Sequence, residues 1–149
     1  MVREPDSFDE VVAPDESIQA AIDRCREGGS ILLKPGTHTM KEGTLLIHKE
    51  VHVFGRGLAR LQVIGLIGIT CMAAVATVDG LIVERTQGPK RDGVQIMSGG
   101  LRLQNTTITG SFQNALVLSR GADPVIVGCR SVPSQKGGRE GISANANRE

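Results

Sequence analysis

The sequence predicts an all-β solenoid, a parallel β-helix of about five to six coils with one helix covering its N-terminal end. Two observations support this prediction. A single helical pattern near the N-terminus gives way, after Gly29, to many short apolar runs separated by Gly, Pro, Asn or Asp. Those runs then recur every 22 to 26 residues. This is the spacing of a solenoid in which each coil carries several short strands.

The helix is expected within residues 15–28, after an N-terminal extension of residues 1–14. Its apolar positions recur at helical spacing and form one stripe: Ile18, Ala21, Ile22 and Cys25. Asp15 or Ser17 is the expected N-cap, and Gly28 is the expected left-handed C-cap. The stripe needs an apolar surface to cover, and the open end of a solenoid offers one.

The coils are expected to fill residues 30–149 as a single domain. The run SILLKPGTHTM at residues 30–40 predicts the first coil. Ile31 to Leu33 form a strand there, Pro35 and Gly36 turn the corner, and Thr37 to Met40 start the next side.

Two interleaved series carry the period. The first consists of alternating apolar pairs: Val51/Val53, Ala76/Val78, Leu101/Leu103 and Val125/Val127. In the second, a small residue precedes an apolar one: Gly68-Ile69, Gly93-Val94, Ala115-Leu116 and Gly141-Ile142. An all-β sandwich also shows strands at short intervals. The solenoid is favoured because both series keep their register over four repeats.

Composition sets limits on function. The net charge is +1, so nothing global favours nucleic acid or a membrane surface, and the basic loops at Lys90-Arg91 and Lys136 to Arg139 are expected to be solvated. The longest uncharged stretch, residues 61–78, is short for a membrane span and is interrupted by Gly and Thr. Three scattered cysteines and a charged N-terminus favour a reducing, cytoplasmic location with no disulfide framework.

The opening SIQAAIDRCREGGSILLKPGTHTMKEGTLLIHKEVHVFGRG resembles that of right-handed parallel β-helix proteins of the pectin-lyase-like superfamily. The segments GADPVIVGCRSV and GREGISANAN resemble the carbohydrate-binding and sugar-hydrolase (CASH) repeats of F-box-associated and Shc SH2-binding-protein-like sequences. The resemblance covers roughly residues 15–149. It implies a right-handed coil, but the superfamily holds lyases, esterases, hydrolases, epimerases and non-catalytic modules, so it does not choose an activity.

Strand alternation predicts one outward ladder on the sheet of the second series. The apolar members of that series should point inward, so their neighbours should point outward: Thr70, Gln95, Val117 and Ser143. This row holds no carboxylate and no cation. Asp92, Asn114 and Glu140 lie just before the strands and are expected either as turn residues or, with Arg91, as the rim of a catalytic site.

Other candidates are weaker. Asp79 before Gly80 fits a turn, and Glu84-Arg85 fits the solvated end of a strand. No metal site is expected, and the three histidines are expected at the surface: His38, His48 and His52. Trp and Tyr are absent, so only Phe54 or Phe112 could stack against a sugar ring.

Two functions follow from these observations. The first is a non-catalytic module that presents the outward row of Thr70, Gln95, Asn114, Val117 and Ser143 to a protein or glycan partner, with no cofactor. The alternative is a polysaccharide-active lyase, hydrolase or epimerase. It would use Asp92 and Glu140 as acid and base with Arg91 or Gln95 assisting, and only this alternative involves calcium. The C-terminal end of the solenoid is expected to be an open edge that joins two copies of the chain.

Overall fold

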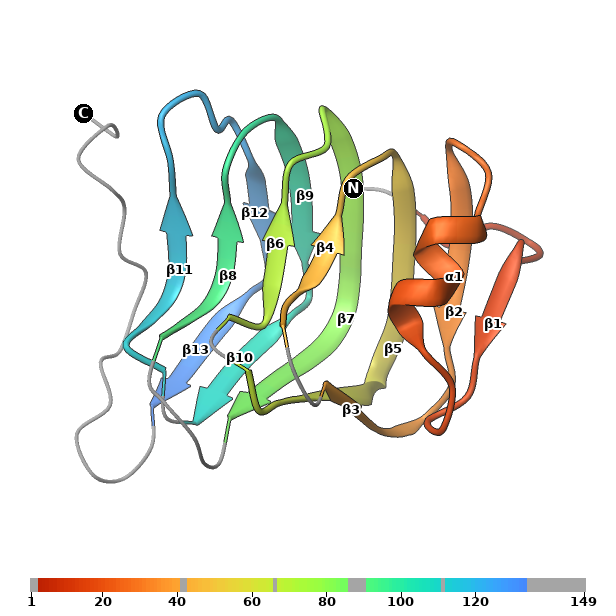
Figure 1. Cartoon of the computed structure of the whole chain (residues 1–149), viewed down its shortest axis with the longest axis horizontal. Helices are drawn as coiled ribbons and strands as arrows, with labels where there is room; N and C mark the ends of the chain where they lie inside the picture. Colours follow the sequence, from red (N-terminus) through yellow and green to blue (C-terminus); the bar gives the residue numbers. More distant parts are fainter. Residues whose placement is uncertain (1–2, 41–42, 66, 86–90, 111, 134–149) are drawn as a thin grey trace.

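The computed structural model is a parallel β-solenoid of about five turns with one short helix near its N-terminus (Figure 1). It describes residues 3–40, 43–65, 67–85, 91–110 and 112–133. The elements follow one another as β1 Glu10–Val12, α1 Ile18–Arg24, β2 Gly29–Leu33, β3 Gly36–Met40, β4 Leu45–Ile47, β5 Val51–Val63, β6 Ile69–Cys71, β7 Val75–Arg85, β8 Asp92–Ile96, β9 Gly100–Gln104, β10 Thr107–Gly110, β11 Asn114–Leu118, β12 Val125–Val127 and β13 Arg130–Pro133.

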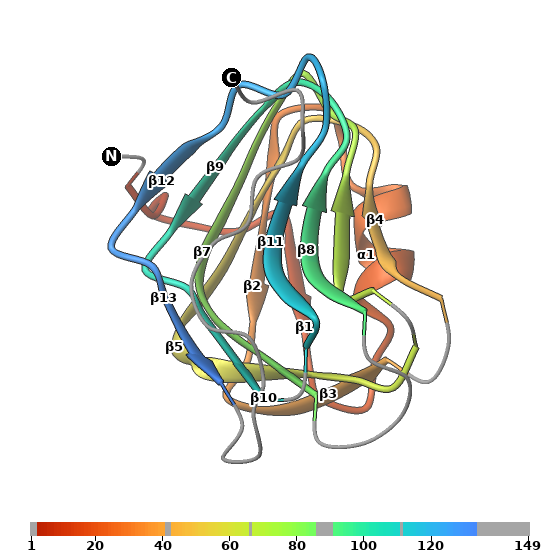
Figure 2. The same ribbon diagram turned by 90° about the vertical axis from the view of Figure 1, so that its left-hand side faces the viewer.

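Each turn of the solenoid crosses three faces, and all pairings between strands are parallel. The first face holds β1, β2, the first halves of β5 and β7, β9 and β12. The second holds β3, the second halves of β5 and β7, β10 and β13. The third holds β4, β6, β8 and β11. Seen from the C-terminal end, the chain turns counterclockwise as it approaches the viewer, which is the right-handed sense (Figure 2).

The corner between the first and second faces is built from left-handed residues. Gly80 has φ 75° and Gly128 has φ 66°, while Asn105 takes the same region with φ 52°. A Cβ on Gly80 would lie 2.7 Å from the backbone nitrogen of Arg56 in the preceding coil. One or two left-handed residues therefore turn the chain sharply in each coil, and this lets β5 and β7 run on from one face to the next.

The core fills the interior of the solenoid with stacked aliphatic side chains. The inward positions of the first face are almost fully buried, at 0 to 1% exposure: Val51, Val53, Ala76, Val78, Leu101 and Leu103. These three pairs of the first series confirm the predicted period. Successive coils thus bury the same columns, which is why the period appears in the sequence.

The fourth pair of that series was predicted in the wrong register. Val125 pairs with Arg102 and Val127 with Gln104, so both valines point outward and are 42% and 37% exposed. Ile126, which pairs with Leu103, packs against the core instead. The coil between β9 and β12 is two residues shorter than the preceding one, so the inward residue lies one position from the expected place. A shift of one residue exchanges the two faces of a strand.

Helix α1 is shorter than predicted but has the predicted apolar stripe. Ser17 is the N-cap and its side chain accepts from Ala20 N, as expected. The expected C-cap at Gly28 is wrong, because the helix ends at Arg24 and Cys25 is already extended. Gly28 does take a left-handed φ of 82°, three residues further on. The residues of the stripe are 0 to 4% exposed and face the solenoid interior.

The helix takes the place of a strand on the third face. The side-chain amide of Gln19 donates from Nε2 to Leu46 O at 3.0 Å and accepts from Leu46 N at 2.8 Å. It thereby pairs with β4 as a neighbouring strand would. Meanwhile β1 pairs with β2, so residues 10–12 of the expected N-terminal extension form part of the solenoid.

Two expectations concern the other end and the membrane. Residues 134–149, on which the expected open C-terminal edge depends, lie outside the described residues. In the described part of the chain, no helix has the length and apolar character needed to cross a bilayer.

Candidate interaction face

The third face carries the outward ladder that the sequence predicts. Thr70 pairs with Gln95, and Gln95 pairs with Val117, so the three lie side by side on adjacent strands. Leu46 of β4 begins the same row. Their inward neighbours Ile69, Val94 and Leu116 are at most 1% exposed. Ser143, the fourth predicted member, lies outside the described residues.

The small residues of the second series are needed for close packing. Gly93 precedes the inward Val94, and a Cβ at Gly93 would lie 2.7 Å from both Ala115 O and Ile108 Cγ2. At Gly68 a Cβ would lie 3.0 Å from Val83 Cγ1. These positions also face the interior, where the second face meets the third. The pattern of a small residue before an apolar one therefore records a tight inward corner.

Asp92, Gln95 and Asn114 converge at the rim of this face, as the sequence suggested. Asp92 pairs with Asn114 in the ladder, accepts from Asn114 Nδ2 at 3.2 Å, and accepts from Gln95 Nε2 at 2.9 Å. Each carboxylate oxygen thus has an amide donor, and Asp92 is only 6% exposed. The arrangement holds one carboxylate in place with two neutral amides.

The remaining predicted rim residues do not add to this cluster. Glu140 lies outside the described residues. Arg91 is exposed, and its backbone carbonyl accepts from Gln113 N at 2.8 Å. Hydrolysis of a glycosidic bond by the general mechanism uses two carboxyl groups about 5 to 9.5 Å apart. The described rim supplies one.

Three cavities are lined by described residues, and Asp92, Gln95 and Asn114 line none of these three. No three His, Cys, Asp or Glu side chains within the described ranges come close enough to hold a metal ion. Within these ranges, then, the third face is an outer sheet surface with a short polar row.

A second acidic cluster lies on the first face. Asp79 accepts from Gln104 Nε2 at 2.7 Å and from Asn105 Nδ2 at 3.2 Å. Asp79 directly precedes the left-handed Gly80, so its position in a turn agrees with the prediction. Both amides come from the next coil, so the cluster ties two corners together.

The prediction of a solvated Glu84-Arg85 pair was half wrong. Glu84 points outward and accepts from Arg60 Nη1 at 2.8 Å. Arg85 points inward, is fully buried, donates to Ile64 O and Gly65 O, and lies 5.1 Å over the ring of Phe112. Burial without a carboxylate partner lowers the pKa of this guanidinium. In strand alternation, Arg85 follows the buried Leu81 and Val83, which is why it faces the core.

The expected surface position holds for His48 and fails for His38. His48 is bonded to Asp23 at 2.9 Å on the helix, with its side chain 41% exposed. His38 is 2% exposed because it occupies the inward column shared with Leu61. Its Nε2 lies 2.9 Å from Lys34 O, and its Nδ1 has no hydrogen-bond partner.

His52 links two coils of the first face. Its Nε2 lies 3.1 Å from Glu50 Oε2, and its Nδ1 lies 2.8 Å from Thr77 Oγ1. A chain of acid, imidazole and hydroxyl is the order that activates a nucleophile in hydrolases. Thr77 is 1% exposed, however, so a substrate carbonyl cannot reach its hydroxyl. The chain cross-links the outer surface of the first face.

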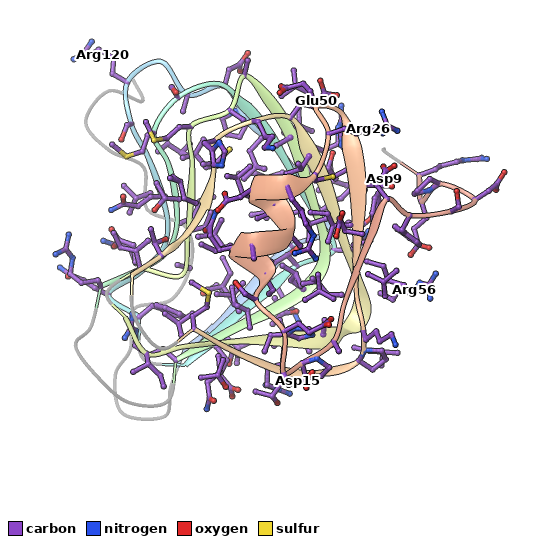
Figure 3. All side chains as sticks on the ribbon, turned by 45° about the vertical axis from the view of Figure 1, so that its right-hand side comes forward. Asp9, Asp15, Arg26, Glu50, Arg56 and Arg120 are labelled. Atoms are coloured by element: carbon purple, nitrogen blue, oxygen red, sulfur yellow. The ribbon has the colours of Figure 1, made fainter. Side chains whose placement is uncertain are left out.

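The N-terminal segment covers part of that surface. Phe8 packs edge-on against Phe54 at 5.9 Å between ring centroids, and Arg56 lies 5.7 Å over the Phe8 ring. In Figure 3, Asp9, Arg26 and Arg56 lie together on this side of the molecule. Phe54 and Phe112 are 1% and 3% exposed. The expectation that either could stack on a sugar is therefore wrong.

The structure also reveals a feature that the sequence analysis missed. Met72 and Met97 lie at the ends of β6 and β8 and are 54% and 41% exposed. Met72 N donates to Ile47 O and Met97 N donates to Cys71 O, so the two hold equivalent places in adjacent coils. Val75, 52% exposed, follows at the same corner. We call Met72, Val75 and Met97 the methionine ridge.

The signal for the methionine ridge was present in the period. The two methionines are 25 residues apart, and each follows an inward residue of the second series by the same spacing. A solvent-facing apolar residue repeated in register indicates a surface stripe rather than core.

Comparisons with models of protein families, with curated proteins and with solved structures found no match in any of the three.

Proposed function

We propose that this chain is a non-catalytic interaction module that binds a partner protein with its third face. The contact surface consists of the outward row Leu46, Thr70, Gln95 and Val117 together with the methionine ridge. The observation that carries the proposal is the ridge itself, in which exposed methionines lie on adjacent coils beside an outer row without charged side chains. Methionine side chains are flexible and polarisable, and they are common at protein-binding surfaces.

A protein partner is favoured over a glycan by the aromatic residues. Sugar-binding sites commonly offer an aromatic ring for stacking. The chain has no Trp or Tyr, and the rings of Phe54 and Phe112 are buried. The outer row offers hydroxyl and amide groups at Thr70 and Gln95, which suit the polar rim of a protein interface.

The enzyme alternative gains no specific support from the described residues. Asp92 is held by two amides, and its neighbours supply neither a second acid nor a cation. Its test is direct. On our proposal, the purified chain does not cleave oligouronates when calcium is added. Cleavage that Asp92→Asn abolishes would replace the proposal with the enzyme alternative.

The binding proposal is tested with Met72→Glu/Met97→Glu. A partner is first captured from the source cells and purified, and its affinity for the chain is then measured by calorimetry. The double variant is expected to weaken binding by at least about tenfold, because two charges would be buried without partners. Leu58→Glu is the matched control, since Leu58 is 60% exposed but lies at the corner between the first two faces. Equal loss in both variants would contradict the proposal.

A further inference from the structure

The second face lacks a strand at its N-terminal end. The first face starts with β1, and on the third face α1 takes the position before β4. On the second face β3 is the first strand, and it pairs only with β5 among the described elements. Residues 13–17 run straight from β1 to α1 through one turn, in which Glu16 N donates to Ala13 O. The first turn of the solenoid therefore omits this side.

The free edge of β3 offers unused backbone groups. Met40 O accepts from Ile64 N, so Met40 bonds towards β5, and His38 two residues earlier does the same. In a parallel ladder the intervening residues face the opposite way. The backbone N–H and C=O groups of Thr37 and Thr39 therefore point to the free edge. There they have no partner among the described residues.

A cavity of about 590 Å³ lies beside this edge. One wall is β3, with His38, Thr39 and Met40, and the other is the start of α1. Ile18 and Leu61 also line it and supply apolar surface. Figure 3 shows Asp15 below the helix, on the side where the second face runs. We call this cavity the β3 slot.

The lining of the β3 slot is acidic. Of the described residues that line it, Asp15 and Glu16 are carboxylates and none is Lys or Arg. Neither carboxylate forms an ion pair with a described cation; Glu16 accepts from the backbone of Ala13. The slot therefore suits an occupant with positive charge.

His38 supplies an independent sign that an occupant is missing. A carbonyl can only accept, so His38 Nε2 donates to Lys34 O, and in the neutral ring Nδ1 is then an acceptor. This nitrogen has no partner, although His38 is 2% exposed. Buried polar atoms are normally bonded. A hydrogen-bond donor at the β3 slot is what the residue lacks.

From these observations we propose that the β3 slot takes up an extended, basic segment of a partner protein as an added strand. The segment would bond to the backbone of Thr37 and Thr39, place apolar side chains on Ile18 and Leu61, and bring Lys or Arg to Asp15 and Glu16. Strand addition at a free sheet edge is an established mode of peptide recognition. This site is separate from the third face and does not depend on it.

The test uses a fluorescein-labelled hexapeptide of alternating Val and Lys, with binding to the full chain measured by anisotropy. The informative variants are Thr39→Pro and Thr39→Ala. Both lose the contact of the Thr39 hydroxyl with Gln62 Oε1, but only proline removes the N–H at the free edge. We expect Thr39→Pro to weaken binding about tenfold or more and Thr39→Ala to leave it within about twofold. Hydrogen exchange should show protection of the Thr37 and Thr39 amides when the peptide is bound.

Several results would overturn the proposal. They are the absence of saturable binding up to about 1 mM peptide, equal binding by Thr39→Pro and Thr39→Ala, or equal binding of a Val-Glu hexapeptide. A wild-type dimer that Thr39→Pro converts to a monomer would instead assign the edge to a second copy of the chain. Met72→Glu/Met97→Glu should bind the hexapeptide like wild type, so failure here and failure of the third-face proposal are distinguishable.

Discussion

Among single residues, the small side chains at the start of the third-face strands decide how closely the coils stack. Gly93 shows this most directly, because a Cβ there would meet backbone and side-chain atoms of the next coil at 2.7 Å. Real Cβ atoms do not approach so closely, so the coils would have to separate.

Gly93→Ala is therefore expected to lower the free energy of unfolding by about 2 kcal/mol, measured by urea denaturation. Gly100→Ala is the matched control, because a Cβ at Gly100 would find Ala74 O at 3.2 Å and Asp123 O at 3.5 Å, and neither glycine has a positive φ. Equal stability of the two variants would show that the inward corner is not tight.

Cys71 predicts a dependence of stability on pH. The thiol is fully buried on β6, and burial raises its pKa from an ordinary value of 9.0. Above pH 9 the unfolded chain releases this proton while the folded chain keeps it. The unfolded state then binds fewer protons, so the free energy of unfolding falls with rising pH, by up to about 1.4 kcal/mol per pH unit for this group.

The measurement compares wild type with Cys71→Ala between pH 8 and pH 10 by thermal denaturation. Stability should fall less steeply in the variant, although the variant is less stable at pH 8 because it leaves a small cavity. Parallel curves for the two proteins would mean that Cys71 titrates alike in the folded and unfolded states.

Two residues show why parts of the structure escaped prediction from the sequence. His38 and Arg85 were assigned to the surface because they are polar, but both hold inward positions of their strands. Alternation from the buried Leu81 and Val83 would have placed Arg85 inside, had position been given more weight than polarity. The acceptors of Arg85 belong to the turn at residues 64–65, which strand periodicity does not position.

Among the elements, helix α1 closes the third face through one side chain. Gln19 both donates to and accepts from the backbone of Leu46, so the edge of β4 is satisfied without a further strand. The sequence predicted the helix from its apolar stripe, but the role of Gln19 depends on which strand the helix meets. That contact spans 27 residues and has no local signal.

Gln19→Ala is expected to cost about 1 to 3 kcal/mol of unfolding free energy, because it leaves a donor and an acceptor of β4 without partners. Arg24→Ala, which removes an exposed ion pair with Glu10 on the same helix, is expected to cost less than about 1 kcal/mol. Urea denaturation followed by circular dichroism compares them. If the two losses were equal, the helix would cover the end by apolar contact alone.

The strands show where the periodic signal holds and where it fails. The second series predicted the third-face ladder correctly through β6, β8 and β11. The first series failed at Val125, where the coil is shorter and the inward residue is Ile126. Period analysis assumes coils of constant length, and here the actual length is set by the Gly and Asn corners.

For the whole molecule, the solenoid gives this chain broad sheet surfaces. Those surfaces differ in chemistry. The first face is partly covered by the N-terminal segment through Phe8 and Phe54, whereas the third face carries a polar row beside the methionine ridge. The sequence analysis located the polar row but missed the ridge, because it treated apolar residues as core. An apolar residue at an outward position is informative only once inward and outward have been assigned.

The measurement that tests the central claim most directly is site-specific photo-crosslinking in the source cells. A photoreactive phenylalanine analogue replaces Met97 in one version of the chain and Leu58 in another, since both side chains are exposed but lie at different corners. Our account predicts one discrete protein adduct from position 97 and none from position 58. No adduct from position 97, or the same adducts from both positions, would contradict the claim that the third face binds a partner protein.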